Sequence, residues 1–368
     1  MTEAGTGTGT GSGVPLGLLV GFEPELRFIV ELARKAEAAG FASIHVAEAN
    51  RNGFVTAAAI AAATERIRIG TYVVNAYARD PWLTGLAARD LHELSGGRFV
   101  LGVGTGNRHL NQWYLGVDSA KPWAKMRDYV TIVRQMVAAP AGASVHYDGP
   151  VHQIRWRAPQ GPGEHGPGEH GVGEHSQGEH SPVPVYLSAS GPKMVRVAGE
   201  VADGVGVGIM SSTRFLADIV RPRARAACEA VGRDPAGLAF PMAAQVSVHD
   251  DEEVARAATR LAVCGLFHPV PHPYYDSQLR QLGFEAFADA ASELMPGGRT
   301  REAMAAVPDE VIDTMTITGT PARCAARLAD YRGLADEVIA FRVPQRGEPA
   351  GLAAYESLLA LAAAQAPA

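Results

Sequence analysis

The chain has 368 residues, of which 47% are hydrophobic and 20% charged, so it can bury a large core and is not a disordered protein. Acidic residues outnumber basic ones by 39 to 33, and the net charge of −6 offers no basic surface for nucleic acid or for an anionic membrane. Three widely spaced cysteines match neither a disulfide framework nor a zinc site, and no apolar run approaches the roughly 20 residues of a membrane span. We therefore expect a cytoplasmic protein, with a disordered glycine-threonine tail at residues 1–13 and a single domain at 14–368.

Short buried strands alternate with amphipathic helices along the first half of the chain. Residues 15–22 form an apolar run typical of a strand. Residues 24–41 follow with apolar side chains at helical spacing, and Gly40 ends that helix. The same alternation predicts strands at 42–49, 66–77 and 98–107, and helices at 55–65, 81–97 and 122–139. Each strand is thus paired with the helix that follows it.

The alternation resumes after residue 182. It predicts strands at 183–190, 203–209, 238–248 and 336–343, and helices at 192–202, 213–232, 251–265 and 321–334. About eight strand–helix units imply parallel strands with right-handed crossovers. Eight such strands close into a (β/α)8 TIM barrel of the α/β class, which is the fold we expect. An open doubly wound sheet is the alternative.

Three segments interrupt this order. Residues 145–156 alternate around Asp148-Gly149, which predicts a β-hairpin. Residues 158–182 carry repeated Gly-Glu-His triplets. Their histidines suggest a metal-binding tract, but the many glycines favour a flexible loop, because ordering a residue costs about 1–2 kcal/mol. Residues 265–311 are less regular and rich in aromatic side chains, so we expect an inserted lid over one face of the barrel.

The glycine-rich loop at residues 96–109 tests whether the chain binds a dinucleotide. The Rossmann fingerprint needs a third glycine where Asn107 stands, and this loop follows the fourth strand rather than the first, so that interpretation fails. At the carboxyl end of a barrel strand, glycine instead lets a flat ligand approach the backbone. The turn at residues 188–193 adds serine hydroxyls and free N–H groups at a helix start, which favours a phosphate site, although N-capping by Ser190 would explain the same residues.

Several ordered motifs give the chain a resemblance to a known family. They are GFASIHVAEA, TERIRIGTYVVNAYARDP, LHELSGGRFVLGVGTGN, VYLSASGPKMVRVAGEVADGV and ITGTPARCAARL. Together they resemble the luciferase-like flavin-dependent oxidoreductases, and within them the branch that uses the deazaflavin coenzyme F-420. The resemblance implies a barrel fold, a homodimer, and hydride transfer between F-420 and a small organic substrate at the C-terminal face of the barrel.

The resemblance also implies where the cofactor binds. In the family an acidic residue contacts the polar edge of the ring, a bulge with a non-proline cis peptide supports the ring from behind, and a serine-rich turn holds the phosphate. The matching positions here are Glu48, Tyr72, Val73, Asn75, Gly106, Asn107, Ser188, Ala189, Ser190, Gly191 and Gly208. No metal is implied.

The catalytic residues are less well matched than the cofactor site. The candidates are Glu48, Asn107 and His109, with His268 and His272 of the expected lid as further proton donors. Ala49 and Asn107 stand where sugar-phosphate dehydrogenases of the family carry a histidine and a glutamate. We therefore do not expect a sugar phosphate as the substrate.

Two alternative functions stay open beside F-420-dependent hydride transfer. One is an FMN-dependent monooxygenase of the same family, which needs a peroxyflavin that a deazaflavin cannot form; the motif GTYVVNAYARDP favours F-420. The other is a flavin-binding protein without catalytic activity, since neither an acid nor a base is assured. The apolar helix expected at residues 351–364 offers a dimer surface, or it packs within one subunit.

Overall fold

The computed structural model describes residues 13–119, 122–160, 182–268 and 272–365. The expected tail at 1–13 lies almost wholly outside the described residues, and so does most of the Gly-Glu-His loop at 158–182. Among the described residues, no helix combines the length and the apolar character needed to cross a membrane.

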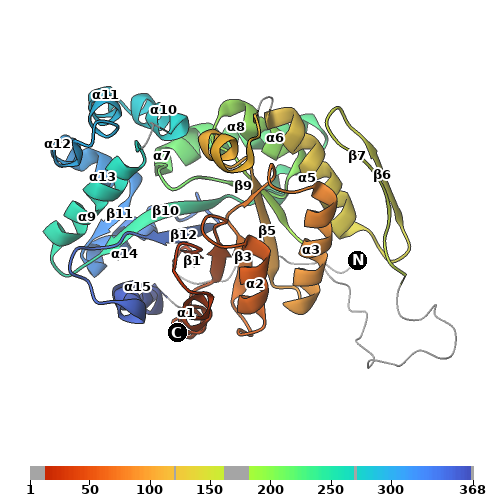
Figure 1. Ribbon diagram of the computed structural model, residues 1–368, viewed down its shortest axis with the longest axis horizontal. Coiled ribbons are helices and arrows are strands. Elements are labelled where there is room, and N and C mark those ends of the chain that lie inside the picture. The colour runs from red at the N-terminus through yellow and green to blue at the C-terminus, as the bar shows by residue number, and fades with distance from the viewer. Residues whose placement is uncertain (1–12, 120–121, 161–181, 269–271, 366–368) are drawn as a thin grey trace.

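Parallel strands curl into a barrel at the centre of the molecule (Figure 1). In ring order they are β12 (Glu337–Arg342), β1 (Leu16–Val20), β2 (Ser43–Val46), β3 (Arg68–Thr71), β5 (Phe99–Gly104), β8 (Val185–Ser188), β9 (Gly204–Gly206) and β10 (Pro241–Val248). β10 pairs with β12, and two isolated parallel bridges, Gly204–Ala239 and Val207–Met242, join β9 to β10. The ring therefore closes, which confirms the barrel and excludes the open doubly wound sheet.

Helices cover the outside of the barrel. They are α1 (Leu26–Ala38), α2 (Gly53–Ala61), α3 (Pro81–Leu94), α5 (Pro122–Ala138), α6 (Pro192–Val201), α8 (Arg221–Ala230), α9 (Glu252–Gly265), α14 (Pro321–Ala329) and α15 (Glu356–Gln365). The main core lies between strands and helices, because alternate residues of each strand point outward and are apolar. Leu358 and Leu361 of α15 are buried in that same core, so this helix packs within the chain. The homodimer stays a prediction.

The inside of the barrel holds a buried charged group. His45 and Glu337 lie with Nε2 and Oε2 3.3 Å apart, and Ser43 and Arg68 contact the same carboxylate. A Cβ at Gly70 would collide with the His45 ring, so this glycine makes the room that the cluster needs. Burial alone would raise the pKa of Glu337, but these neighbours outweigh it and lower the pKa to about 2.

Residues 273–315 form a compact set of helices beside the barrel, which we call the helical extension. It consists of α10 (Pro273–Gln281), α11 (Glu285–Leu294), α12 (Thr300–Ala305) and α13 (Asp309–Met315). Phe287 and Ile312 of the extension are buried with Phe267, which precedes it, in an apolar cluster separate from the main core. The expectation of an irregular segment was therefore wrong, because each helix is too short for its period to show. Its action as a lid remains a prediction.

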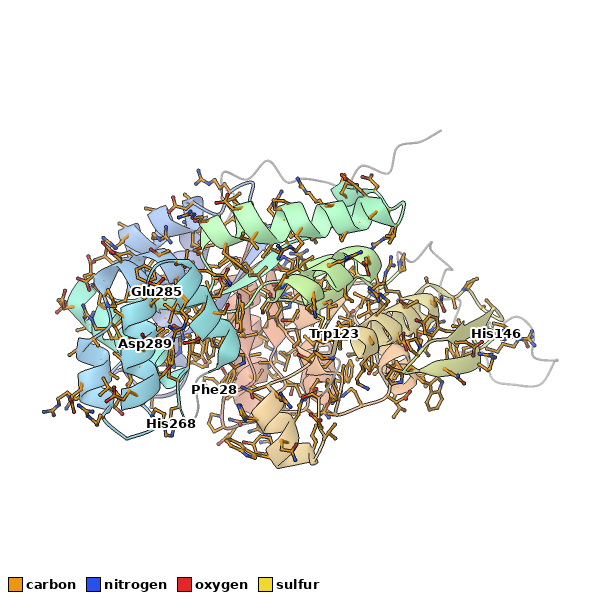
Figure 2. All side chains as sticks on the ribbon, turned by 90° about the horizontal axis from the view of Figure 1, so that it is seen from above. Phe28, Trp123, His146, His268, Glu285 and Asp289 are labelled. Atoms are coloured by element: carbon orange, nitrogen blue, oxygen red, sulfur yellow. The ribbon has the colours of Figure 1, made fainter. Side chains whose placement is uncertain are left out.

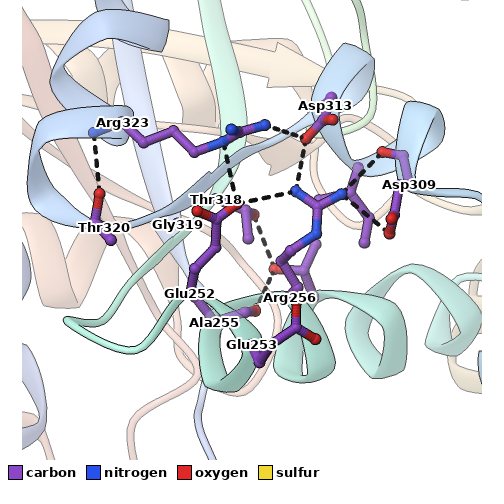
Figure 3. A network of polar contacts seen from close by, with 12 residues as sticks. Glu252, Glu253, Ala255, Arg256, Asp309, Asp313, Thr318, Gly319, Thr320 and Arg323 are labelled. Atoms are coloured by element: carbon purple, nitrogen blue, oxygen red, sulfur yellow. Dashed lines mark hydrogen bonds and ion pairs between the residues drawn. The ribbon is translucent and has the colours of Figure 1, made fainter.

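A network of charges ties the helical extension to the barrel helices (Figure 3). Arg256 of α9 is 7% exposed, and its guanidinium lies 2.8 Å from Oδ1 of Asp313 and 3.0 Å from Oδ1 of Asp309, both on α13. Arg323 of α14 reaches Asp313 as well, at 2.9 Å. The extension is also joined through backbone hydrogen bonds, because β11 (Ile317–Gly319) pairs with the end of β10.

The predicted hairpin is present at one end of the molecule (Figure 1). It is formed by β6 (Ser144–Asp148) and β7 (Gln153–Arg157), which pair antiparallel. Val145 and Ile154 pack with residues of α5, so the hairpin is fixed to the barrel through that helix. It lies at the opposite end of the molecule from the helical extension (Figure 1).

Candidate active site

The carboxyl ends of the strands form the mouth of the barrel, and Tyr72 and Val73 lie across it. A cis peptide bond joins these two residues between β3 and β4 (Val74–Asn75), at the position that the resemblance implies. The hydroxyl oxygen of Tyr72 lies 2.7 Å from the carbonyl oxygen of Val207 and 3.2 Å from that of Pro241, where β9 meets β10. Burial raises the pKa of Tyr72 well above its usual range, so the side chain stays neutral.

An apolar floor surrounds Tyr72 at the mouth. It consists of Leu19, Ala47, Tyr72, Ala243 and Ile339, with Val73, Ile209 and Phe341 packed against it. These side chains come from five neighbouring strands, β10, β12, β1, β2 and β3, or from the residue just after the strand, because inward-pointing residues of different strands meet at the same level. The floor gives a flat aromatic ligand a surface without charge.

Glu48 follows β2 and is held by its own protein neighbours. Its carboxylate accepts hydrogen bonds from the backbone N–H of Gly53 at 3.2 Å and of Asn75 at 3.0 Å, and it forms an ion pair with Arg79. The side chain is 13% exposed. Glu48 therefore fixes β4 to the start of α2, and any contact with a cofactor would be made beside this structural role.

Asn75 forms a hydrogen-bonded pair with a residue that the sequence analysis did not single out. Its Nδ2 donates to Oδ1 of Asn111 at 2.7 Å, and Asn111 in turn donates to the carbonyl of Thr105 at 2.8 Å. Gly106 has a φ of +63°, and a Cβ there would lie 2.6 Å from Nδ2 of Asn75. This glycine is therefore required by the pair. Asn111 was missed because it begins a short π-helix, Asn111–Leu115, which has no clear sequence signal.

The structure separates the candidate histidines. His109 is exposed on the short helix α4 (Arg108–Leu110), and Oδ1 of Asn107 accepts its backbone N–H at 2.8 Å. Burial lowers the pKa of His272, and the charge of His109 lowers it further; Nδ1 of His272 accepts the backbone N–H of Tyr274 at 3.3 Å, so this side chain caps the start of α10. His268 instead lies with the helical extension, with Nδ1 3.4 Å from the carbonyl oxygen of Met295, and Figure 2 places it at the far end from the hairpin residue His146.

The turn after β8 presents an open helix start. Gly191 is the N-cap of α6, no side chain caps that helix in the described part of the chain, and an added Cβ at Gly191 would meet no atom within 4 Å. N-capping by Ser190 is thus not what the structure shows. Ser188 and Ser190 are partly exposed, whereas the side chain of Ala189 is buried in the core and leaves only its backbone for a ligand.

Tyr274 of the helical extension closes one side of this turn. Its hydroxyl contacts those of Ser211 and Ser190, and burial raises its pKa to about 12. A Cβ at Gly208 would lie 3.1 Å from the Tyr274 ring, so glycine at the end of β9 admits the aromatic side chain. The extension therefore reaches the same turn that the sequence analysis assigned to phosphate.

These features fit a flat ring that carries a phosphate group. The floor is apolar, the helix start offers uncapped N–H groups, and serine hydroxyls stand beside it. The positive end of the α6 dipole favours an anion there. No three His, Cys, Asp or Glu side chains gather to hold a metal ion among the residues that the structure describes.

The chain is similar to several known proteins. The sequence profile of the luciferase-like monooxygenase family matches residues 1–337. A putative coenzyme F-420-dependent oxidoreductase of Mycobacterium tuberculosis is 30% identical, over 83% of this chain and 88% of the relative. A methylenetetrahydromethanopterin reductase of Archaeoglobus fulgidus is 28% identical, over 81% and 82%. The solved F-420-dependent tetrahydromethanopterin reductase of Methanopyrus kandleri superposes with a TM-score of 0.76 at 21% identity, over 96% and 98%, which is a likeness of fold.

Proposed function

The chain belongs to the luciferase-like monooxygenase family, and from that premise we propose that it transfers a hydride between coenzyme F-420 and a small organic substrate. The observation that carries the proposal is the uncapped start of α6 beside an apolar floor at the mouth of the barrel. A phosphate group at the helix start would place an attached ring over Tyr72 and Val73. The name of one curated relative favours F-420 over FMN, since that protein is described as a putative F-420-dependent oxidoreductase.

The residues of the chain have separate tasks in this proposal. Ser188, Ser190 and the backbone of Gly191 hold the phosphate, and the apolar floor excludes water from one face of the ring. When bound, the deazaflavin supplies or accepts the hydride. Asn75 and Gly106 border the ring, and Glu48 keeps Asn75 in place through its backbone N–H.

A proton must accompany the hydride when a carbonyl is reduced or an alcohol oxidised. We assign this task to His109 and His272. Nδ1 of His272 accepts the backbone N–H of Tyr274 at 3.3 Å, so a neutral His272 ring carries its proton on Nε2 and can donate it there, and His109 is exposed on α4. Asn107 positions His109 by accepting its backbone N–H.

Cofactor binding is the first test. The protein is titrated with F-420 and, separately, with FMN, and quenching of each cofactor's own fluorescence is followed. Micromolar binding of F-420 with weak binding of FMN supports the proposal. Tight binding of FMN alone overturns it in favour of the FMN-dependent monooxygenase, and oxygen consumption is then measured. Binding of neither cofactor overturns both.

A further inference from the structure

The charged group inside the barrel lies one layer below the apolar floor. Side chains of a barrel strand point inward at every second residue, so the residue two positions before a floor residue points into the layer beneath it. For Ile339 of the floor this residue is Glu337, and for Ala47 it is His45. Their side chains meet in that layer, with Oε2 and Nε2 3.3 Å apart. The Glu337 carboxylate is therefore buried beneath the surface assigned to the cofactor ring.

Glycines give this pair its space. Gly17 and Gly70 stand in the same layer, each two positions before a floor residue. A Cβ at Gly17 would lie 2.9 Å from Oε1 of Glu337, and a Cβ at Gly70 would collide with Nδ1 of His45. The layer beneath the floor is thus filled from two strands, and its negative charge lies inside the barrel.

The Glu337 carboxylate is ionised although the residue is only 4% exposed. Burial raises its pKa, but His45, Arg68 and Ser43 outweigh burial and hold the pKa at about 2. Ser43 and Arg68 come from a layer further down, since each lies two positions before a residue of the pair's layer. Arg68 is 3.4 Å from the carboxylate and its side chain is 47% exposed, so water screens its charge. The negative charge is therefore nearer to the floor than the positive one.

Tyr72 joins the pair to the floor. The His45 and Tyr72 rings lie 5.9 Å apart between centroids and meet edge to face at 82°. Burial and the neighbouring Tyr274 raise the pKa of Tyr72, and the charge of Glu337 raises it further. Because Tyr72 belongs to the floor, the field of Glu337 reaches the surface on which we place the ring.

We infer that the charge of Glu337 favours the oxidised over the reduced form of the bound cofactor ring, and so favours reduction of the substrate. The inference rests on the proposed function and deepens it by giving the direction of hydride transfer. When a hydride leaves the ring for a carbonyl carbon, a C–H bond of the ring breaks, and its two electrons and proton form the new C–H bond of the substrate. The substrate oxygen takes a proton from water or a side chain. The ring is left more positive by one charge, which a negative charge beneath it stabilises.

The size of the effect follows from the distance. Two residues of a strand span about 7 Å, and a ring resting on the floor adds about 3.5 Å, so the charges lie about 10 Å apart. At an effective dielectric constant of about 20, two unit charges at that distance change an equilibrium constant roughly tenfold. A tenfold change corresponds to about 30 mV in the potential of a two-electron couple.

Binding of the two redox forms tests the inference without an assay of turnover. The affinities of oxidised and of reduced F-420 for the full chain are measured by anaerobic equilibrium dialysis. Mildly alkaline buffer keeps the reduced ring from taking up a further proton. Glu337→Gln keeps the shape of the side chain but removes its charge, and should lower the preference for the oxidised form about tenfold. A purely structural role of Glu337 would weaken both forms alike, and an unchanged ratio of the two affinities overturns the inference.

Two further variants check the sign of the effect. Arg68→Met removes the cation beside Glu337 and should raise the preference for the oxidised form, by about twofold because the cation is screened. Glu293→Gln is the matched control, since it removes a carboxylate that is 78% exposed on α11, and it should leave the ratio as in the wild type. An unchanged or lower preference in Arg68→Met overturns the inference, and this variant decides if Glu337→Gln fails to fold. A shift in Glu293→Gln as large as that in Glu337→Gln also overturns it.

The two proposals can fail separately. If FMN binds and neither form of F-420 does, the proposed cofactor is overturned, and the same ratio measured with oxidised and reduced FMN decides the effect of Glu337. If F-420 binds and Glu337→Gln leaves the ratio unchanged, only the effect of Glu337 is overturned. Binding of neither cofactor overturns both.

Discussion

The phosphate site predicts opposite effects of one substitution on stability and on cofactor binding. Gly191 has a φ of −80° and no neighbour within 4 Å of an added Cβ, so Gly191→Asp fits without strain. An aspartate is a better N-cap than glycine and should stabilise the folded protein by a few tenths of a kcal/mol. It should also weaken F-420, because its carboxylate occupies the N–H groups of α6 and repels the phosphate.

The magnitude follows from Coulomb's law. At a separation of about 5 Å and an effective dielectric constant of about 40, two unit charges repel by about 1.7 kcal/mol. That repulsion weakens binding roughly twentyfold, before the lost N–H donors are counted. The expected signature of Gly191→Asp is therefore an unchanged or slightly higher melting temperature together with a dissociation constant for F-420 at least roughly twentyfold higher.

Calorimetric melting and cofactor fluorescence, measured on the same samples, separate the two effects. Gly237→Asp is the matched control, since Gly237 also meets no neighbouring atom and ends the short helix Pro235–Gly237 far from the turn after β8. It should leave F-420 binding as it is in the wild type. If Gly191→Asp binds F-420 as tightly as the wild type does, the assignment of the phosphate to α6 is refuted.

Three further predictions concern side chains described above. Glu48→Gln leaves one donor of Asn75 or Arg79 without its acceptor and should destabilise the protein by about 2 kcal/mol, which a chemical denaturation curve would detect. The pKa of Glu337 in the folded protein is about 2, below its usual 4.5, so the carboxylate stabilises the fold above about pH 4.5 and this stabilisation is lost as the pH falls towards 2. Glu337→Gln should therefore flatten the dependence of the urea midpoint on pH between about 4.5 and 2. Arg256→Met should lower the free energy of unfolding by about 1–2 kcal/mol. A buried charge left without its partner typically costs roughly 3–5 kcal/mol, but the partner carboxylates here, Asp313 and Asp309, are 40% and 63% exposed and stay hydrated. A loss of melting temperature that corresponds to more than this would contradict the reasoning.

The barrel could be predicted from sequence because its signal is local and repeated. Each strand is an apolar run, and most of the helices that follow have a period that can be read within about fifteen residues. The position of the cis peptide bond at Tyr72–Val73 followed from the resemblance, and the structure confirms it. The turn at Ser190 and Gly191 was recognised as a phosphate candidate, and the missing side-chain cap removed the competing explanation.

The parts that could not be predicted depend on contacts between distant residues. The helical extension was read as irregular, since its helices are short and broken by turns such as Gly283 and Gly298, both with positive φ. Asn111 becomes recognisable only when the loop after β5 brings it to Asn75. His45 and Glu337 lie far apart in the chain, and only closure of the barrel between β1 and β12 brings them together in its interior.

Two strands, β9 and β11, pair with the same edge of β10. β9 is bridged to the start of β10, at Ala239 and Met242, whereas β11 pairs with its last residues, Val246 to Val248. The amides of β11 should therefore exchange with deuterium as slowly as those of the barrel strands. The amides of α10 and α11, which are not hydrogen-bonded to the sheet, should exchange faster. Local unfolding would then swing Tyr274 away from the turn at Ser190 and leave the barrel intact, which gives a bulky ligand a way in and out without breaking the ring of strands.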